Sequence, residues 1–154
     1  MTMNDPTPGD VSLPIRSLLS PAASDDAAAT PNLYAVLGAE TFWRIARAFY
    51  KRVDTHTSLR SMFPADLEEP IRNQAQFLIQ YFGGPMEYSL RKGHPRLRMR
   101  HAHFAIDVAA RNAWIECMRG ALEEAAVPEP HRATMLVYFE RTATFLMNTN
   151  ETEK

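Results

Sequence analysis

The chain has 154 residues, 45% of them hydrophobic and 23% charged, and a formal net charge of −1 at pH 7. This length and composition are typical of one globular domain and exclude disordered, collagen-like and membrane classes. The longest uncharged stretch has 14 residues (73–86), whereas a membrane-spanning helix needs about 20 apolar residues. The first ten residues carry two aspartates and no Lys or Arg, unlike a secretory signal, so we expect a cytoplasmic location.

Three segments are expected along the chain. Residues 1–31 contain five of the 11 prolines, no aromatic residue, and four Asp against one Arg. Such a composition cannot bury much apolar surface, so it predicts a flexible N-terminal extension. Residues 32–150 form the predicted folded domain, and residues 151–154 form a polar C-terminal tail.

Apolar residues of the predicted domain recur every three or four positions, which is the helical period. Thr30 and Pro31 are suited to begin a short helix that Gly38 ends. Further helices are expected over 42–53, from Pro70 to 81, from 94–95 to about 101, from 107 to 125, and from 130 to 146, with a turn over 58–63. The pattern therefore predicts an all-α domain of about six helices and no sheet.

The histidine spacing argues against a zinc site. His101 and His103 point to different faces of a helix, and His94 and His101 lie two turns, or about 10 Å, apart. Cys117 is the only cysteine, so disulfides, multi-cysteine zinc sites and cofactor attachment through two cysteines are excluded. A single imidazole still suffices for haem, because the porphyrin supplies four ligand nitrogens itself.

Basic residues surround His101, which follows Leu97 by one helical turn. They suit the two carboxylates of haem, because an arginine fork pairs well with a carboxylate. A solvated helix face is the simpler alternative for these cations. Nucleic-acid binding is a third interpretation, but the pI of about 6.5 and the lack of a second basic run argue against it. The cations are Arg91, Lys92, Arg96, Arg98 and Arg100.

Three hydrogen-bonding side chains lie on predicted apolar stripes. Tyr50 and Trp114 each bring a donor into the interior, and Gln74 brings an amide. Ordinary core packing is the more common explanation for the two aromatic residues, and partial exposure near a helix start explains Gln74 equally well. Together the three also suit a core that encloses a polar ligand such as bound dioxygen.

Four stretches of the sequence form a recognisable pattern: QFLIQYFGGP (76–85), YS (88–89), GHPRLRMRHAHF (93–104) and AWIECM (113–118). This pattern resembles the group II truncated haemoglobins, and the similarity runs from about residue 34 to 150. The resemblance implies a two-over-two helical sandwich around one non-covalent haem b.

The resemblance also implies roles for individual residues. His101 matches the proximal iron ligand, and Tyr50, Trp114 and Gln74 match polar residues on the distal side. Arg100 matches a residue that pairs with a haem propionate, and Tyr88 belongs to the same region. The remaining implied haem contacts are Phe63, Phe77, Phe104 and Met118.

Two residues depart from the family pattern. Pro70 stands where relatives carry a small residue or threonine, and proline has no donor to offer a ligand. If Pro70 begins its helix, the preceding turn is expected to fray. His103 stands where proline is usual, and we expect its side chain to face solvent rather than a propionate.

The predicted function is that of a haem protein that binds dioxygen, and also NO and CO, at a pentacoordinate iron. Alternatives are an NO dioxygenase or a peroxidase-like enzyme that uses an external reductase, or a sensor of diatomic gases. The sequence contains no G-x-G-x-x-G motif for a nucleotide cofactor, so either enzyme needs a separate electron donor. We expect a monomer or homodimer with no nucleic-acid or membrane partner.

Overall fold

The computed structural model describes residues 32–149, and the predicted segments 1–31 and 151–154 lie outside them. Within these residues there are seven α-helices, one 3-10 turn and no strand, so the all-α prediction is confirmed. No helix among them is both long and apolar enough to cross a membrane. The elements are α2 (Leu33–Leu37), α3 (Ala39–Asp54), η4 (Arg60–Met62), α4 (Glu68–Tyr81), α5 (Glu87–Lys92), α6 (Leu97–Arg100), α7 (Val108–Glu124) and α8 (His131–Phe145).

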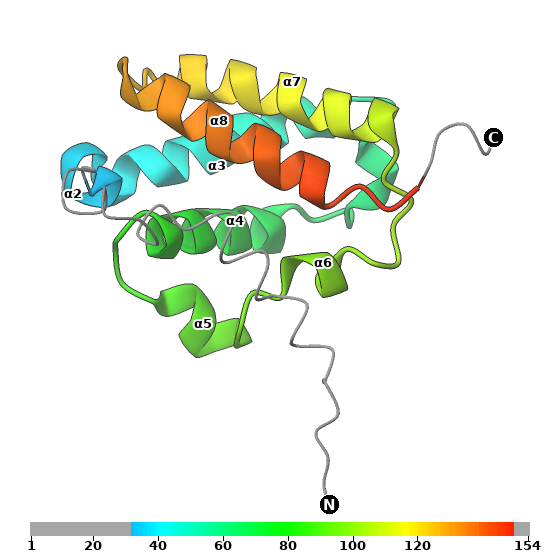
Figure 1. The fold of residues 1–154 in the computed structure, drawn as a ribbon, viewed down its shortest axis with the longest axis horizontal. Coiled ribbons are helices and arrows are strands. Elements are labelled where there is room, and N and C mark those ends of the chain that lie inside the picture. Colours follow the sequence, from blue (N-terminus) through cyan, green and yellow to red (C-terminus); the bar gives the residue numbers. More distant parts are fainter. Residues whose placement is uncertain (1–31, 150–154) are drawn as a thin grey trace, which may run out of the picture.

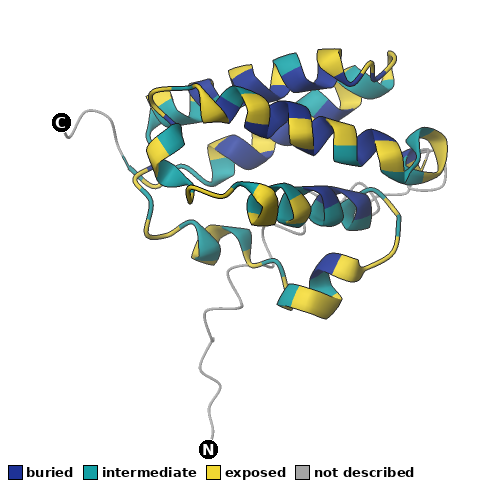
Figure 2. Cartoon of the chain, turned by 180° about the vertical axis from the view of Figure 1, so that it is seen from behind, coloured by how far each residue is buried: buried dark blue, intermediate teal, exposed yellow. Residues whose placement is uncertain are grey.

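Four long helices make up the body of the molecule (Figure 1). Helix α3 packs against both α4 and α7, and α8 packs against α7. The two short helices α5 and α6 lie on the other side of α4 from α7 and α8 (Figure 1). The buried faces of the long helices point toward one another, and their exposed faces point outward (Figure 2).

The predicted stripe of α3 forms the centre of the core. Phe42, Ile45, Phe49 and Val53 are fully buried, as expected for residues spaced by one helical turn. Helix α7 adds Met118, Ala121 and Leu122, and α8 adds Met135 to the same core. Burial of this stripe fixes the rotation of α3 about its axis.

Several helix starts differ from the predictions. Helix α3 begins at Ala39 rather than at 42, and α6 begins at Leu97 rather than at 94–95. The N-cap of α2 is Asn32 rather than Thr30, and its side chain accepts a hydrogen bond from the Ala35 amide. Helix α4 begins at Glu68, so Pro70 is its third residue and not its first. The first four amides of a helix have no acceptor inside the helix, so a proline there removes no hydrogen bond.

Helix α5 is absent from the predictions. Only Tyr88 of this helix is buried, and Leu90 is 86% exposed, so no apolar stripe marks it in the sequence. The features that favour a helix here are Glu87 in the first turn, basic residues in the last turn, and Gly93 as C-cap with a φ of 84°.

The starts of α7 and α8 agree with the predictions. Asp107 caps α7 by accepting a hydrogen bond of 2.9 Å from the Ala110 amide. Helix α8 begins directly after Pro130. Since α7 and α8 pack on one another, these caps fix the layer that carries Trp114.

Candidate functional site

Tyr50 lies near the end of α3 and is 7% exposed. Its ring meets the Phe63 ring edge to face, with centroids 5.4 Å apart, and touches Phe49 in the same way at 4.9 Å. Burial raises the pKa of the Tyr50 phenol well above its ordinary value. The hydroxyl therefore stays protonated and keeps its capacity to donate a hydrogen bond.

Trp114 enters the same region from α7. The centroid of its ring lies 5.0 Å from that of the Phe49 ring and 5.6 Å from that of the Phe139 ring. The buried Phe49 therefore contacts both predicted donors, Tyr50 and Trp114. Helix α3 packs directly on α7, and this contact brings together two residues that are 64 positions apart. Tyr50 and Trp114, the Phe49 ring between them, and Phe63, which packs on Tyr50, are called the distal cluster below, after the side predicted for them.

Gln74 lies in α4, which packs on the other side of α3. Its Oε1 atom is buried and has no hydrogen-bond partner among the described residues. A buried amide oxygen without a partner costs about 1–3 kcal/mol, and native proteins rarely tolerate it unless another group completes the site. Helix α4 carries a second such oxygen on the neighbouring Asn73, and the two unpartnered oxygens point to a polar ligand or cofactor at this helix.

His101 follows α6 directly as its C-cap residue. Its Nδ1 atom lies 2.7 Å from the carbonyl oxygen of Leu97, one turn earlier. A carbonyl can only accept a hydrogen bond, so Nδ1 carries the proton and Nε2 keeps its lone pair. This tautomer and its fixed ring are the usual state of a metal-binding histidine.

The environment keeps the His101 imidazole neutral. Burial lowers its pKa below the ordinary value, the hydrogen bond to Leu97 opposes this effect, and the nearby His103 adds to the lowering. Only the neutral imidazole binds a metal ion. The side chain is therefore poised as a ligand at neutral pH.

Tyr88 is buried and lies between Phe77 and Arg100. Its ring is 5.7 Å from the Phe77 ring, and the Arg100 guanidinium lies 6.0 Å from the Tyr88 ring centroid. The same guanidinium donates hydrogen bonds to the carbonyl oxygens of Lys92, Pro95 and His94 at 2.7–3.2 Å. In this structure Arg100 thus ties together the loop between α5 and α6, while its pairing with a propionate stays a prediction.

Of the other predicted residues, Met118 is fully buried in α7, and Phe104 is half-buried after α6. His103, one of the two departures from the family pattern, is exposed, and its ring centroid lies 4.1 Å from that of Phe104 with the rings tilted by 38°. Among the basic residues around His101, Arg91 pairs with Glu69 at 3.2 Å, and Arg98 donates to the Phe145 carbonyl at 2.8 Å. Much of this basic charge therefore has structural partners.

The residues present fit a haem group. His101 offers one free ring nitrogen, the half-buried Phe63 and Phe77 offer apolar rings, and Gln74 carries an unsatisfied polar oxygen. No group of three or more His, Cys, Asp or Glu side chains within residues 32–149 is arranged to hold a metal ion by itself. A metal at His101 would thus have to bring its remaining ligands with it, as the iron of haem does.

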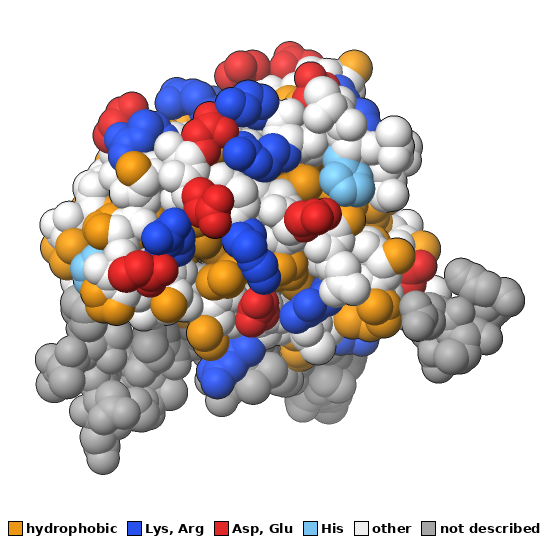
Figure 3. All heavy atoms as spheres, turned by 90° about the horizontal axis from the view of Figure 1, so that it is seen from above, with side chains coloured by type: hydrophobic (Ala, Val, Ile, Leu, Met, Phe, Trp, Pro, Cys, Tyr) orange, Lys and Arg blue, Asp and Glu red, His pale blue; other side chains and the backbone are white. Residues whose placement is uncertain are grey.

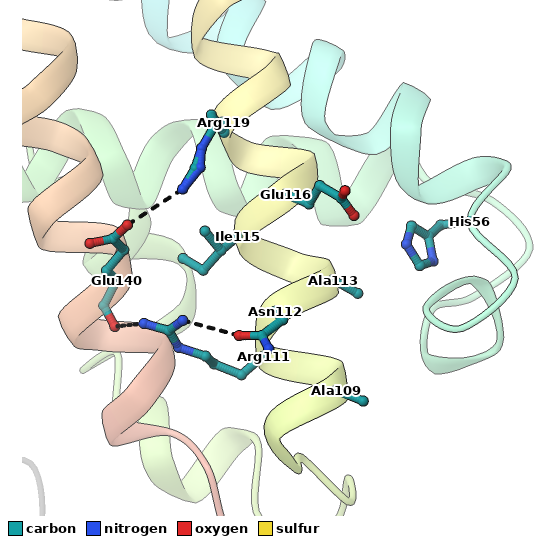
Figure 4. A pocket seen from close by; sticks show the side chains of 9 residues that line it. All are labelled: His56, Ala109, Arg111, Asn112, Ala113, Ile115, Glu116, Arg119 and Glu140. Atoms are coloured by element: carbon teal, nitrogen blue, oxygen red, sulfur yellow. Dashed lines mark hydrogen bonds and ion pairs between the residues drawn. The ribbon is translucent and has the colours of Figure 1, made fainter.

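A separate hollow of about 490 Å³ lies beside α7 and contains none of the predicted site residues (Figure 4). Two arginines in it are already bound: Arg119 faces Glu140 at 3.6 Å, and Arg111 donates to the Glu140 carbonyl and to Asn112. The molecular face above α7 and α8 carries acidic and basic side chains intermixed (Figure 3). No single charge sign dominates this face.

Two residues near the site were not found from the sequence. Asn73 has a buried Oδ1 atom without a hydrogen-bond partner among the described residues. The sequence predicts only its neighbour Gln74 as the polar residue on the apolar stripe of this helix. Asn148 binds the segment that follows His101. It lies beyond α8 and 47 positions from His101, so no local pattern signals it.

Residues 32–148 match the family described as bacterial-like globin. Among curated proteins, the group 2 truncated hemoglobin YjbI of Bacillus subtilis is 38% identical over 120 residues, which cover 78% of this chain and 91% of that protein. The chain belongs to the bacterial-like globin family.

Solved structures place it more narrowly within that family. The hemoglobin of the thermophilic bacterium Chloroflexus aurantiacus is 52% identical with a TM-score of 0.75, covering 78% of this chain and all of that one. The group II truncated hemoglobin of Bacillus anthracis is 36% identical with a TM-score of 0.75, covering 79% and 93%. The resemblance to group II truncated haemoglobins and the predicted two-over-two fold are confirmed.

Proposed function

We propose that this globin holds one non-covalent haem b through His101 alone and binds dioxygen, NO and CO on the side of Tyr50, Trp114 and Gln74. Membership of the globin family makes it a haem protein that binds oxygen. The observation that carries the finer proposal is the 2.7 Å contact between His101 Nδ1 and the Leu97 carbonyl, because it leaves Nε2 free. Haem, when bound, supplies the iron to which a diatomic ligand coordinates.

The distal residues would hold the ligand by hydrogen bonds. The Tyr50 hydroxyl stays protonated because burial raises its pKa, and the Trp114 indole N–H can only donate. Each hydrogen bond contributes about 1 kcal/mol, and about 1.5–3 kcal/mol when the acceptor carries charge. Two donors aimed at one acceptor favour slow ligand release, and this suits retention of oxygen better than easy unloading.

The same side chains argue for ligand binding over acid–base turnover. A peroxidase-like reaction needs a distal group that exchanges protons near neutral pH, and burial moves the pKa of Tyr50 away from that range. NO dioxygenation demands no such group, but it needs electrons from a reductase, since the sequence has no nucleotide-binding motif. Redox turnover is therefore expected only when an external donor is supplied.

The non-covalent attachment follows from the side chains available. Cys117 is the only cysteine, it is buried in α7, and burial raises the pKa of its thiol. A buried, protonated thiol is a poor nucleophile. Haem should therefore be extractable with acidified organic solvent.

His101→Ala tests the proposal, with His103→Ala as the matched control two residues away. The haem content of each purified variant is measured from its Soret absorption after haem is supplied. We expect His101→Ala to lose stable haem binding, whereas His103→Ala should keep it, because the His103 ring is exposed and lies against Phe104. A normal five-coordinate ferrous spectrum in His101→Ala would remove His101 from its proposed role.

A further inference from the structure

The segment between α6 and α7 carries His101 and has little support of its own. Helix α6 has only four residues, and none of them is buried. So short a helix is not stable by itself in water. The position of His101 must therefore be set by contacts from elsewhere in the chain.

The end of the described chain supplies those contacts. Figure 1 shows it running beside the segment that leads from α6 to α7. Arg98 of α6 donates to the Phe145 carbonyl at 2.8 Å, and its guanidinium lies 5.3 Å from the centre of the Phe145 ring. Helix α8, which ends at Phe145, is itself packed on α7.

Asn148 makes the larger set of contacts. Its Nδ2 donates to the carbonyl oxygens of Phe104 at 2.8 Å and His101 at 3.4 Å, and its Oδ1 accepts from the Ile106 amide at 2.9 Å. The Asn148 and Thr149 amides in turn donate to the Ile106 carbonyl at 3.0 and 3.2 Å. One residue thereby binds the backbone on both sides of the turn after His101.

The chemistry of these contacts requires an amide side chain. The Oδ1 faces a backbone donor, and the Nδ2 faces two backbone acceptors. Only Asn or Gln offers an acceptor and two donors on one planar group, and the longer Gln would displace that group by one methylene. An aspartate keeps the acceptor, but it places a carboxylate oxygen against the carbonyl oxygens of Phe104 and His101, where no hydrogen bond can form.

We propose that Asn148 is a positioning residue for the proximal ligand: it fixes the backbone of His101 and so sets the height and tilt of the imidazole toward iron. This inference rests on the proposed function, in which His101 is that ligand. Two constraints then act on His101 together. Asn148 holds its carbonyl group, and the Leu97 carbonyl orients its ring through Nδ1.

The test compares Asn148→Asp and Asn148→Ala with the wild type as haem-loaded proteins. Two quantities are measured: the iron–histidine stretching frequency of the ferrous protein by resonance Raman spectroscopy, and the rate of haem transfer to an excess of apomyoglobin. We expect the band to shift or broaden and haem loss to accelerate at least about fivefold, as expected when one or more hydrogen bonds are lost. Asn148→Asp, which keeps the side-chain size and the bond from Ile106, covers the case in which Asn148→Ala does not fold.

Asn112 supplies the matched control. It is exposed on α7 and its Oδ1 accepts one bond from Arg111, so Asn112→Asp makes the same chemical change away from His101. That variant should leave both the Raman band and the transfer rate unchanged. If the Asn148 variants lower only the thermal stability, with the band and the haem loss of the wild type, Asn148 is a structural clamp and the inference is overturned.

The two proposals fail in different ways. If His101→Ala keeps the wild-type spectrum, the proposed function fails, and this inference fails with it. If His101→Ala loses haem while both Asn148 variants keep the wild-type band, only the positioning role is wrong.

Discussion

Tyr50 and Trp114 lie within two long helices, whereas His101 directly follows a helix of four residues. The proposed distal donors, Tyr50 and Trp114, are held by packing, because the fully buried Phe49 touches both rings. The proposed proximal ligand, His101, is held by hydrogen bonds: Asn148 donates to its backbone carbonyl, and its ring Nδ1 donates to the Leu97 carbonyl.

Because packing holds one side of the site and hydrogen bonds hold the other, ligand release and haem retention should depend on different residues. Packing in the core is tight and transmits small changes in volume, so the distal donors keep their geometry as long as the core is intact. Hydrogen bonds at the surface are individually weak, so the proximal segment can be altered without disturbing the core. Ligand release should depend on the distal cluster, and haem retention on the proximal segment.

The largest effect is expected from truncating Phe49, the residue whose ring contacts both Tyr50 and Trp114. Phe49→Ala should lower the free energy of unfolding by about 3–5 kcal/mol, because a fully buried ring leaves a cavity. Denaturant unfolding measures the loss. Val137→Ala, at a 47% exposed position on α8, is the control and should change stability by less than about 0.5 kcal/mol; equal effects of the two would contradict a packed distal cluster.

Trp114→Phe sharpens the comparison by removing one donor while keeping a ring. Dioxygen dissociation should become about tenfold faster, which corresponds to the loss of about 1.4 kcal/mol, and stopped-flow mixing measures it. Trp43→Phe is the matched control, because Trp43 is half-buried on α3 and stacks with Arg47 at 5.4 Å. An unchanged dissociation rate in Trp114→Phe would show that the indole does not reach the ligand.

The smallest effect is expected at the two ion pairs that Glu124 of α7 makes with α3 on the protein surface. Glu124 accepts from Lys51 and Arg52, both at 2.7 Å, and these cations lower the pKa of its carboxyl below the ordinary 4.5. The ion pairs therefore stabilise the fold at pH values above the ordinary carboxyl pKa. Their contribution disappears as the pH falls through the lowered pKa of Glu124 in the folded protein.

Glu124→Gln measures this contribution. Its melting temperature should lie slightly below that of the wild type at pH 7, since exposed pairs are worth little. The gap should close as the pH falls below the lowered pKa of Glu124, and also at high salt. A gap that persists in acid would mean that the side chain acts through packing and not through charge.

Most of the distal side could be predicted from the sequence. The stripe of Phe42, Ile45, Phe49 and Val53 specifies α3 and buries it as expected, and Tyr50 follows from the same period. Asp107 marks the start of α7 through its capping bond, which places Trp114. Helical periodicity is a strong signal because the burial of a whole helix face depends on it.

The proximal side was less predictable for a physical reason. Its order comes from side chains that bind distant backbone carbonyls, such as Asn148 to Phe104 and Arg98 to Phe145, and such contacts leave no periodic trace. Helix α5 also has no periodic signal in the sequence, because Tyr88 is its only buried residue. Pro70 was assigned to the first helical position although the third position tolerates it equally well.

His101 is proposed to be the only side chain that coordinates the iron of haem. The most direct measurement is the absorption spectrum of the ferrous, ligand-free protein after haem is supplied. We predict a Soret band at one haem per chain with the spectrum of a five-coordinate iron bound by a single histidine. A protein that stays colourless, or a six-coordinate spectrum from a second side-chain ligand, would contradict the account.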